Sequence, residues 1–189
     1  VCCIYNTARI WFGKKGFAVK EVRVGLIGYG LSGAVFHAPL ISSVHGLVLQ
    51  KVVSSNPDKV RRDFPDIVVV PDVSSLLSDP DIDIIVISSP NTTHFEYAKQ
   101  ALHANKHVIV EKPFVNRSKD ADELIRMAEQ RNLLLSVFQN RRWDNDFLTV
   151  KKCIQEGLLG DIYTYEAHYD RFRPQISGKW KECELEGSG

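Results

Sequence analysis

Hydrophobic and polar positions between residues 22 and 137 form two kinds of segment that alternate along the chain. One kind is a short apolar run without polar alternation, which is typical of a strand buried on both faces of a sheet. The other kind repeats its apolar residues every three or four positions, which indicates a helix with one buried face. These patterns predict strands over 22–27, 47–54, 67–70, 83–88, 107–110 and 133–137, helices over 31–44 and 58–62, and two more helices that begin near residues 91 and 118.

The alternation of strands with helices also predicts how the elements are arranged. Strands that are joined through a helix become parallel neighbours, and the helices come to cover both faces of the sheet. We therefore expect an α/β fold, a doubly wound parallel sheet, over residues 21–140. Pro39 should kink or shorten the first helix, because proline lacks the N–H group that a helix interior needs. Residues 1–20 are basic and contain no acid, and we interpret them as a poorly ordered extension.

The pattern changes after residue 140. A helix with one apolar side is predicted near 146–156. Residues 162–173 then alternate strictly between two faces, which predicts a half-exposed strand. We interpret residues 141–189 as a linker helix followed by the first strand of a second, truncated α/β domain. The aromatic face of that strand would be an aggregation risk without a partner, so we expect the isolated chain to associate or precipitate. A homo-oligomer is expected for the full-length protein. This face consists of Tyr163, Tyr165 and Tyr169.

Composition limits the classes of function. Of the 189 residues, 44% are hydrophobic and 25% are charged, which is ordinary for a globular protein. Lys and Arg number 24 against 23 Asp and Glu, so the net charge of +1 gives no electrostatic reason to expect nucleic acid or an anionic membrane as a partner. No apolar run reaches the roughly 20 residues that span a bilayer.

Cysteine, histidine and methionine positions add three expectations. The 4 cysteines are irregularly spaced and include no C-x-x-C pair, which favours a reduced, cytoplasmic setting over a disulfide framework. The histidines follow no metal-ligand spacing, so no metal site is expected. The only methionine is Met127 and the chain begins with Val1, which indicates an unusual start codon, a processed chain or a fragment. Because the chain also stops just after the predicted strand over 162–173, we expect it to be an N-terminal fragment of a longer protein.

Three glycines follow the first predicted strand and open the first helix. The run Gly28-x-Gly30-x-x-Gly33 has the spacing of a dinucleotide site. In such a site the first glycine makes a tight turn, the second lets the backbone approach a pyrophosphate, and the third lets the helix pack closely on the strand. The N–H groups at the helix start would face the phosphates, and Tyr29 and Leu31 would lie beside them. A merely structural glycine turn is the alternative.

The end of the second strand bears on which dinucleotide would bind. An NAD site usually places Asp or Glu about 20 residues after the glycines, where it holds the ribose hydroxyls. The sequence has Ser54 and Ser55 instead. These serines could donate hydrogen bonds to a 2′-phosphate, with Lys59 or Arg62 supplying positive charge. This favours NADP, with NAD still possible, and the alternative is an ordinary loop with an Asn-Pro turn.

Two further polar clusters follow buried strands, at the edge where doubly wound sheets bind ligands. The first cluster follows the predicted strand over 83–88, and the second follows the predicted strand over 107–110. The second cluster, Glu111-Lys112-Pro113, places a charged pair at the end of a buried strand, which needs either pairing or a function. A lysine over the cofactor crevice could hydrogen-bond a substrate hydroxyl and stabilise the alkoxide that forms as hydride departs. A helix-capping turn is the alternative for the first cluster and a surface ion pair for the second. The first cluster holds the candidate cofactor residues Ser88, Ser89, Pro90, Asn91 and His94.

Taken together, these motifs resemble those of the glucose–fructose oxidoreductase/inositol dehydrogenase (Gfo/Idh/MocA) family. The resemblance rests on the glycine motif, on Ser-Pro-Asn-x-x-His over 89–94 and on Glu-Lys-Pro over 111–113. Two longer stretches, 36–41 and 140–148, are similar to the NADP-dependent scyllo-inositol dehydrogenase-like branch of that family.

The resemblance implies a Rossmann domain that binds NADP, in an enzyme that oxidises a secondary alcohol of a sugar or polyol. It identifies Lys112 as the catalytic lysine, gives Glu111 a place beside the cofactor, and places Asn140 and Arg141 near the nicotinamide and the substrate. It also implies a catalytic Asp and His beyond Gly189, so this chain should bind cofactor but turn over poorly. A nucleotide-sensing module with the same fold and no chemistry is the alternative.

Overall fold

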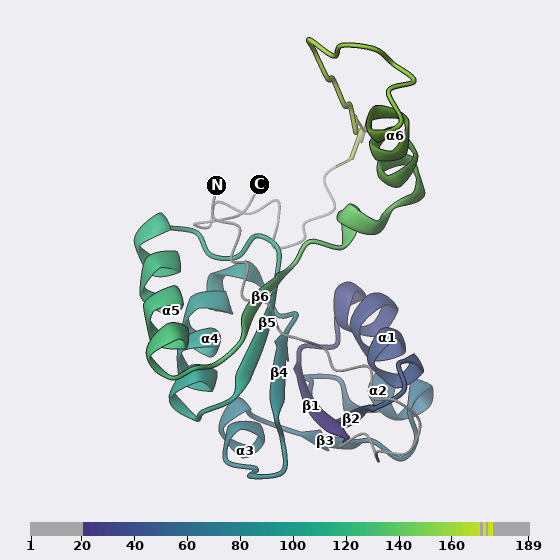
Figure 1. Ribbon diagram of the computed structural model, residues 1–189. Helices are drawn as coiled ribbons and strands as arrows, with labels where there is room; N and C mark the ends of the chain where they lie inside the picture. The colour runs from purple at the N-terminus through teal and green to yellow at the C-terminus, as the bar shows by residue number, and fades with distance from the viewer. Residues whose placement is uncertain (1–20, 171, 173, 176–189) are drawn as a thin grey trace, which may run out of the picture.

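The computed structural model describes residues 21–170, 172, 174 and 175, and it contains one sheet of 6 strands in the order β3-β2-β1-β4-β5-β6 (Figure 1). Every pair of neighbouring strands in this sheet is parallel. The order is that of a doubly wound dinucleotide-binding sheet, so the predicted fold class is confirmed. The strands are β1 (Val22–Ile27), β2 (Leu47–Val53), β3 (Val68–Val70), β4 (Ile84–Ile87), β5 (His107–Glu111) and β6 (Leu135–Phe138).

The predicted helices form, and the structure adds a short one that the pattern did not indicate. This helix, α3, is stabilised at its start by the Asp72 side chain, which accepts a hydrogen bond of 2.8 Å from the N–H of Ser75. Within the described residues, no helix is long and apolar enough to cross a bilayer. The helices are α1 (Ala38–Ser43), α2 (Pro57–Asp63), α3 (Val73–Leu77), α4 (His94–His103), α5 (Ser118–Gln130) and α6 (Asn145–Gln155), with the short turns η1 (Gly33–His37), η2 (Asn91–Thr93) and η3 (Asn140–Trp143).

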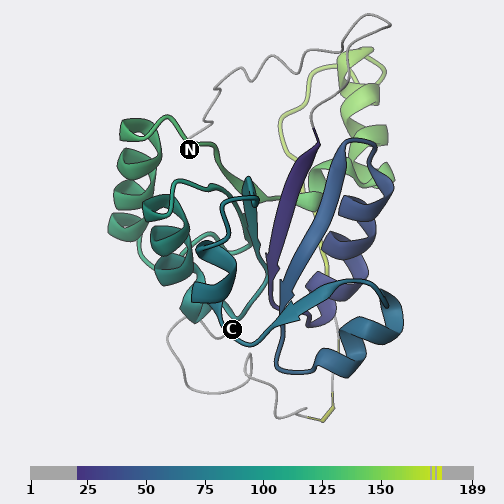
Figure 2. The same cartoon turned by 90° about the horizontal axis from the view of Figure 1, so that it is seen from below.

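Helices cover the sheet on both faces, with α1 and α2 on one side and α3, α4 and α5 on the other (Figures 1 and 2). Because successive strand residues point to opposite faces, one strand supplies both cores. In β4, Ile85 and Ile87 pack with Leu102 of α4 and Leu124 of α5, whereas Val86 packs in the core under α1 and α2. This two-sided burial is the physical reason that the strands read as continuous apolar runs.

The centre of the sheet is where the chain changes direction. β1 pairs with β2 on one side and with β4 on the other, so the connections from this pair run to opposite faces. Such a switch point leaves a crevice outside the carboxyl ends of the central strands, because no helix crosses it. The ends of β1, β4 and β5 therefore border the position where a ligand would bind.

Pro39 shapes the first helix. α1 begins with Ala38 and Pro39, directly after the π-helical turn η1, which the N–H of Ala38 closes by donating to the carbonyl of Gly33. The chain is already helical from Leu31, so Pro39 lies inside a continuous helical segment. The π-type turn changes the hydrogen bonding just before the proline, whose ring and missing N–H an ordinary helix interior does not accommodate. The wider turn, in place of a kink, leaves the His37 side chain buried at the end of η1.

The strand predicted over residues 162–173 is not formed in its described part, because residues 162–170 pair with no other strand. An alternating pattern specifies two faces, but a strand also needs a neighbouring edge, and the described residues offer none there. Tyr163, Tyr165 and Tyr169 are exposed. The assignment of 141–189 to a second domain and the homo-oligomer stay predictions, and 1–20 lie outside the described residues.

Candidate functional site

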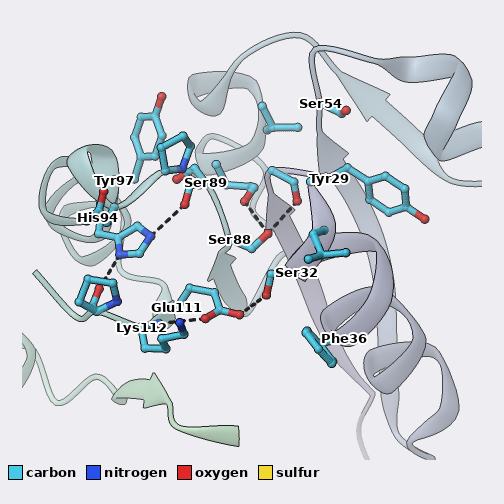
Figure 3. Close-up of a pocket in the computed structure, with 18 of the residues that line it drawn as sticks. Tyr29, Ser32, Phe36, Ser54, Ser88, Ser89, His94, Tyr97, Glu111 and Lys112 are labelled. Atoms are coloured by element: carbon cyan, nitrogen blue, oxygen red, sulfur yellow. Dashed lines mark hydrogen bonds between the residues drawn. The ribbon is translucent and has the colours of Figure 1, made fainter. Parts of the chain in front are cut away.

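A cleft of about 1050 Å³ lies outside the carboxyl ends of β1, β4 and β5 (Figure 3). It brings together nearly all of the side chains that the sequence singled out, although they come from five separate connections. The exceptions are Gly33, Lys59 and Arg62, which do not line the cleft. The predicted residues along the wall are Gly28, Tyr29, Gly30, Leu31, Ser54, Ser55, Ser88, Ser89, Pro90, Asn91, His94, Glu111, Lys112, Asn140 and Arg141.

Each glycine of the elbow after β1 is required for a different reason. Gly28 has φ +93°, and a Cβ there would lie 2.9 Å from the Ser88 carbonyl oxygen. A Cβ on Gly33 would lie 2.3 Å from the Gly28 carbonyl oxygen, so only glycine lets the helix approach this closely. A Cβ on Gly30 would meet nothing within 4 Å, because this residue faces the open cleft. The elbow thus leaves an open space beside backbone, which fits a pyrophosphate.

A hydroxyl from the neighbouring strand end stabilises the elbow. Ser88 Oγ donates a hydrogen bond of 2.8 Å to the Gly28 carbonyl, and it lies 3.2 Å from the Ile27 carbonyl (Figure 3). Ser88 is therefore engaged in shaping the turn. Its neighbour Ser89 pairs with Thr93 at 2.6 Å between the two hydroxyl oxygens.

Glu111 ends β5 and connects three parts of the site. Its Oε1 accepts hydrogen bonds from Ser32 Oγ and, at 3.1 Å, from His37 Nε2, and its Oε2 accepts one of 2.9 Å from the Lys112 N–H. Burial raises the pKa of the Glu111 carboxyl, but the hydrogen bonds from His37, Ser32 and Lys112 outweigh burial and hold this pKa below its usual value. Glu111 is therefore ionised at neutral pH, and it is the only acid among the described residues that line the cleft.

The Glu111→Gln variant should lose about 1 kcal/mol of stability at pH 7, because an amide cannot accept from all three donors. The pKa of Glu111 is lower in the folded protein than its usual 4.5, so the carboxylate's contribution is complete above pH 4.5 and is lost as pH falls through the folded value. Urea unfolding of both proteins from pH 3 to 7 measures this. A stability difference that persists unchanged at pH 3 would contradict it.

Lys112 follows Glu111 and lines the cleft with an exposed side chain. The peptide bond between Lys112 and Pro113 is cis. His94, which is 1% exposed, lies between the loops after β4 and β5, with Nδ1 2.8 Å from the Pro113 carbonyl and Nε2 3.0 Å from the Ser89 carbonyl. Because both ring nitrogens face protein acceptors, His94 connects the two loops and keeps no nitrogen for a ligand.

The far end of the cleft, after β2, is polar and has a cation close by. Ser54 Oγ accepts a hydrogen bond of 3.1 Å from the Asn56 N–H, which turns the chain into α2. Lys59 Nζ donates to the Tyr29 carbonyl at 3.1 Å and lies 5.4 Å from the centre of the Tyr29 ring. Burial, followed by the hydrogen bond and negative charge of Asp63, raises the pKa of Tyr29 to about 12. The Tyr29 side chain is therefore uncharged at neutral pH, and the carbonyl and ring of Tyr29 hold the Lys59 ammonium group beside the elbow.

Asn140 and Arg141 lie on η3, where the chain leaves β6. Both line the cleft, and their predicted place beside a nicotinamide and a substrate stays a prediction. Arg141 is exposed, and its guanidinium donates a hydrogen bond of 2.7 Å to Asp144. Arg62, the second cation suggested for the phosphate end, pairs instead with Asp63 at 3.5 Å.

Sequence reasoning missed several residues of the site. Ser32, Phe36, Tyr97 and Gln139 also line the cleft, and His37 lies behind it. Ser32 lies inside the glycine motif, so its position could have been noted. Phe36 and His37 lie inside the stretch 36–41 that carried the family resemblance, but nothing in that stretch predicts that His37 turns toward Glu111. In the part of the chain that the structure describes, no group of three or more His, Cys, Asp or Glu could hold a metal ion.

An open glycine elbow at the switch point of a parallel sheet defines a dinucleotide-binding domain. The model of the oxidoreductase family with an NAD-binding Rossmann fold (Gfo/Idh/MocA) matches residues 22–139. The chain belongs to this family.

Relatives with longer chains share the sequence and the fold. The uncharacterized oxidoreductase YdgJ of Escherichia coli is 50% identical over 169 residues, which cover 89% of this chain and 49% of that protein. The Bacillus subtilis protein IolW, named scyllo-inositol 2-dehydrogenase (NADP(+)), is 42% identical over 171 residues, 90% of this chain and 48% of its own. The chain therefore spans about half the length of these curated relatives.

Solved structures of oxidoreductases also superpose on this chain. A Yersinia pestis protein described as an oxidoreductase superposes with a TM-score of 0.82 at 50% identity, over 85% of this chain and 46% of that chain. The apo scyllo-inositol dehydrogenase of Lactobacillus casei superposes with a TM-score of 0.68 at 26% identity, over 77% of this chain and 44% of its own.

Proposed function

We propose that this chain is the cofactor-binding part of an NADP-dependent oxidoreductase, which transfers hydride between the nicotinamide and a secondary alcohol of a sugar or polyol. The observation that carries the proposal is one cleft that holds both the open elbow at Gly30 and the lysine Lys112. The name of IolW, which acts on scyllo-inositol with NADP⁺, supports both the cofactor and the substrate class.

The residues present fit the cofactor. The elbow amides and the start of the following helix would hold the pyrophosphate, since free N–H groups and the helix dipole favour an anion there. Ser54 and Ser55 would donate to the 2′-phosphate, and Lys59 would supply positive charge beside them. Among the described residues that line this end of the cleft, none carries a carboxylate that would repel that phosphate. When bound, the nicotinamide supplies the acceptor or donor of the hydride.

Lys112 would act on the substrate. Its ammonium group can donate a hydrogen bond to the substrate hydroxyl oxygen and stabilise the negative charge that develops there as hydride departs. Asn140 and Arg141, on the outer side of the cleft, would bound the substrate's position. Glu111 is too fully hydrogen-bonded to Ser32, His37 and Lys112 to be the proton acceptor.

Isothermal titration calorimetry of the chain with NADPH, NADH and adenosine 2′,5′-bisphosphate tests the proposal. We expect NADPH to bind at least tenfold more tightly than NADH, and the bisphosphate to bind measurably because it carries the 2′-phosphate. Tighter binding of NADH would overturn the choice of NADP. If neither dinucleotide bound, the assignment of this cleft to a cofactor would fail.

Lys59→Met should weaken NADPH binding roughly 10- to 100-fold and leave NADH binding within twofold, because a charge-assisted hydrogen bond of about 1.5–3 kcal/mol to the phosphate would be lost. The matched control is Lys119→Met, which removes an exposed lysine from α5 on the other face of the sheet. Calorimetry with both dinucleotides measures the effect. An equal loss for NADPH and NADH would show that Lys59 supports the elbow through Tyr29 and not the phosphate.

A further inference from the structure

Two residues that the proposed chemistry does not use converge on Glu111. Ser32 lies in the first turn after the glycine elbow, and His37 ends η1. Both donate to the same oxygen of Glu111, whose other oxygen accepts from the Lys112 N–H. Figure 3 shows the hydrogen bonds that Glu111 accepts from Ser32 and Lys112. One carboxylate thus bridges the helix that faces the phosphates and the backbone of the lysine.

Packing holds the His37 donor of this bridge in place. His37 is 4% exposed, and its ring lies against Phe138 with 4.2 Å between the ring centres. The Glu111 side chain is 12% exposed, and a carboxylate buried to this degree is costly unless donors compensate for the lost water. Three donors on two segments do so, because Ser32 and His37 lie on the helix after the elbow and the Lys112 N–H follows β5. The carboxylate cannot move to another partner without leaving some of these donors unpaired. Its position therefore follows the position of the helix.

We propose that Ser32 and His37 are positioning residues, which act through Glu111 to fix the backbone of Lys112 and couple it to the glycine elbow. Where it concerns the cofactor, this inference rests on the function proposed above. A ligand that orders the elbow then also orders the lysine, and by linkage a well-placed lysine strengthens binding at the elbow. Lys112 itself remains the group that would contact the substrate.

Hydrogen exchange of backbone amides, resolved by NMR, measures directly how strongly the Lys112 N–H is protected by its hydrogen bond to Glu111. His37→Leu and Ser32→Ala each remove one donor, and we expect the Lys112 N–H to exchange at least fivefold faster in both. His37→Gln and Ser32→Thr keep a donor and should stay within twofold of the wild type. The reference is the Val108 N–H, which donates to the Leu134 carbonyl at 2.8 Å within the sheet and should not change in any variant.

The pattern of exchange decides between positioning and general stability. Unchanged exchange at Lys112 in both donor-deleted variants would overturn the inference. Equal acceleration at Lys112 and Val108 would overturn it too, because it would show loss of the whole sheet edge. Loss of protection in the conservative variants as well would count against the hydrogen bonds as its cause.

A double-mutant cycle tests the coupling to the cofactor site. His37→Leu should weaken NADPH binding three- to tenfold in the wild-type background and less than 1.5-fold in a Lys112→Met background, since its effect passes through the lysine. Equal effects in both backgrounds would overturn the coupling while the proposed function stands. If the wild-type chain bound no nucleotide, the proposed function would fail. The amide exchange would still test whether Ser32 and His37 position Lys112 through Glu111.

Discussion

Replacing Gly33 with alanine is expected to destabilise the protein by about 3 kcal/mol and to lower its affinity for NADPH by roughly 100-fold or more. The added Cβ would lie 2.3 Å from the Gly28 carbonyl oxygen, and backbone cannot yield as a flexible side chain does. The helix must therefore move away from the elbow, and the amides that would face the phosphates move with it. Urea unfolding and calorimetry measure the two losses.

Gly30→Ala is the matched control, because it adds the same methyl group three residues earlier in the motif. No atom lies within 4 Å of that methyl position, and Gly30 is not among the glycines with positive φ. Stability should be unchanged or higher by up to about 1 kcal/mol. Binding should still fall at least tenfold, because the methyl group occupies the open space of the elbow. Normal NADPH binding by Gly30→Ala would show that no pyrophosphate lies there.

Ser54→Asp is expected to reverse the cofactor preference by about 100-fold overall. The new carboxylate would repel a 2′-phosphate and could accept hydrogen bonds from the two ribose hydroxyls of NADH, which is how NAD sites recognise the ribose. The turn should survive, because a carboxylate can accept from the Asn56 N–H as the serine hydroxyl does. Separate titrations with NADPH and NADH measure the change in preference.

Ser54→Asn separates charge from shape. It has nearly the size of aspartate but no charge, so NADPH binding should fall much less than in Ser54→Asp and NADH binding should gain little. The two variants must also unfold at similar urea concentrations for this comparison to hold. If both lost NADPH binding equally, steric contact and not charge would govern this position, and the argument from the missing carboxylate would be wrong.

The elements of the fold could be predicted because their cause is local in the sequence. Ile85 and Ile87 point to one face of β4 and Val86 to the other, and burial on both faces produces an unbroken apolar run. The apolar run of β4 is therefore sufficient to predict a buried strand. By contrast, α3 has only five residues, and its start depends on the Asp72 cap, which a periodic pattern does not reveal. The segment 162–170 shows the reverse failure, in which a clear pattern exists without a neighbouring strand.

The candidate site was predicted in its parts and not in its connections. Glycine spacing located the elbow, and the ends of strands located Ser88 and Lys112, because parallel strands end at one edge. Nothing in the sequence paired His94 with the Pro113 carbonyl or His37 with Glu111, residues that are 74 positions apart in the latter case. Such contacts depend on the exact path of each loop.

By itself, the sequence determined the class of sheet, the two buried faces and the glycine elbow, since each follows from periodicity or from a backbone that only glycine allows. The tertiary structure alone decided that Glu111 is bound by Ser32, His37 and the Lys112 N–H. The physical reason is range: periodicity acts between neighbours in the chain, whereas a buried carboxylate takes whichever donors the folded segments bring to it.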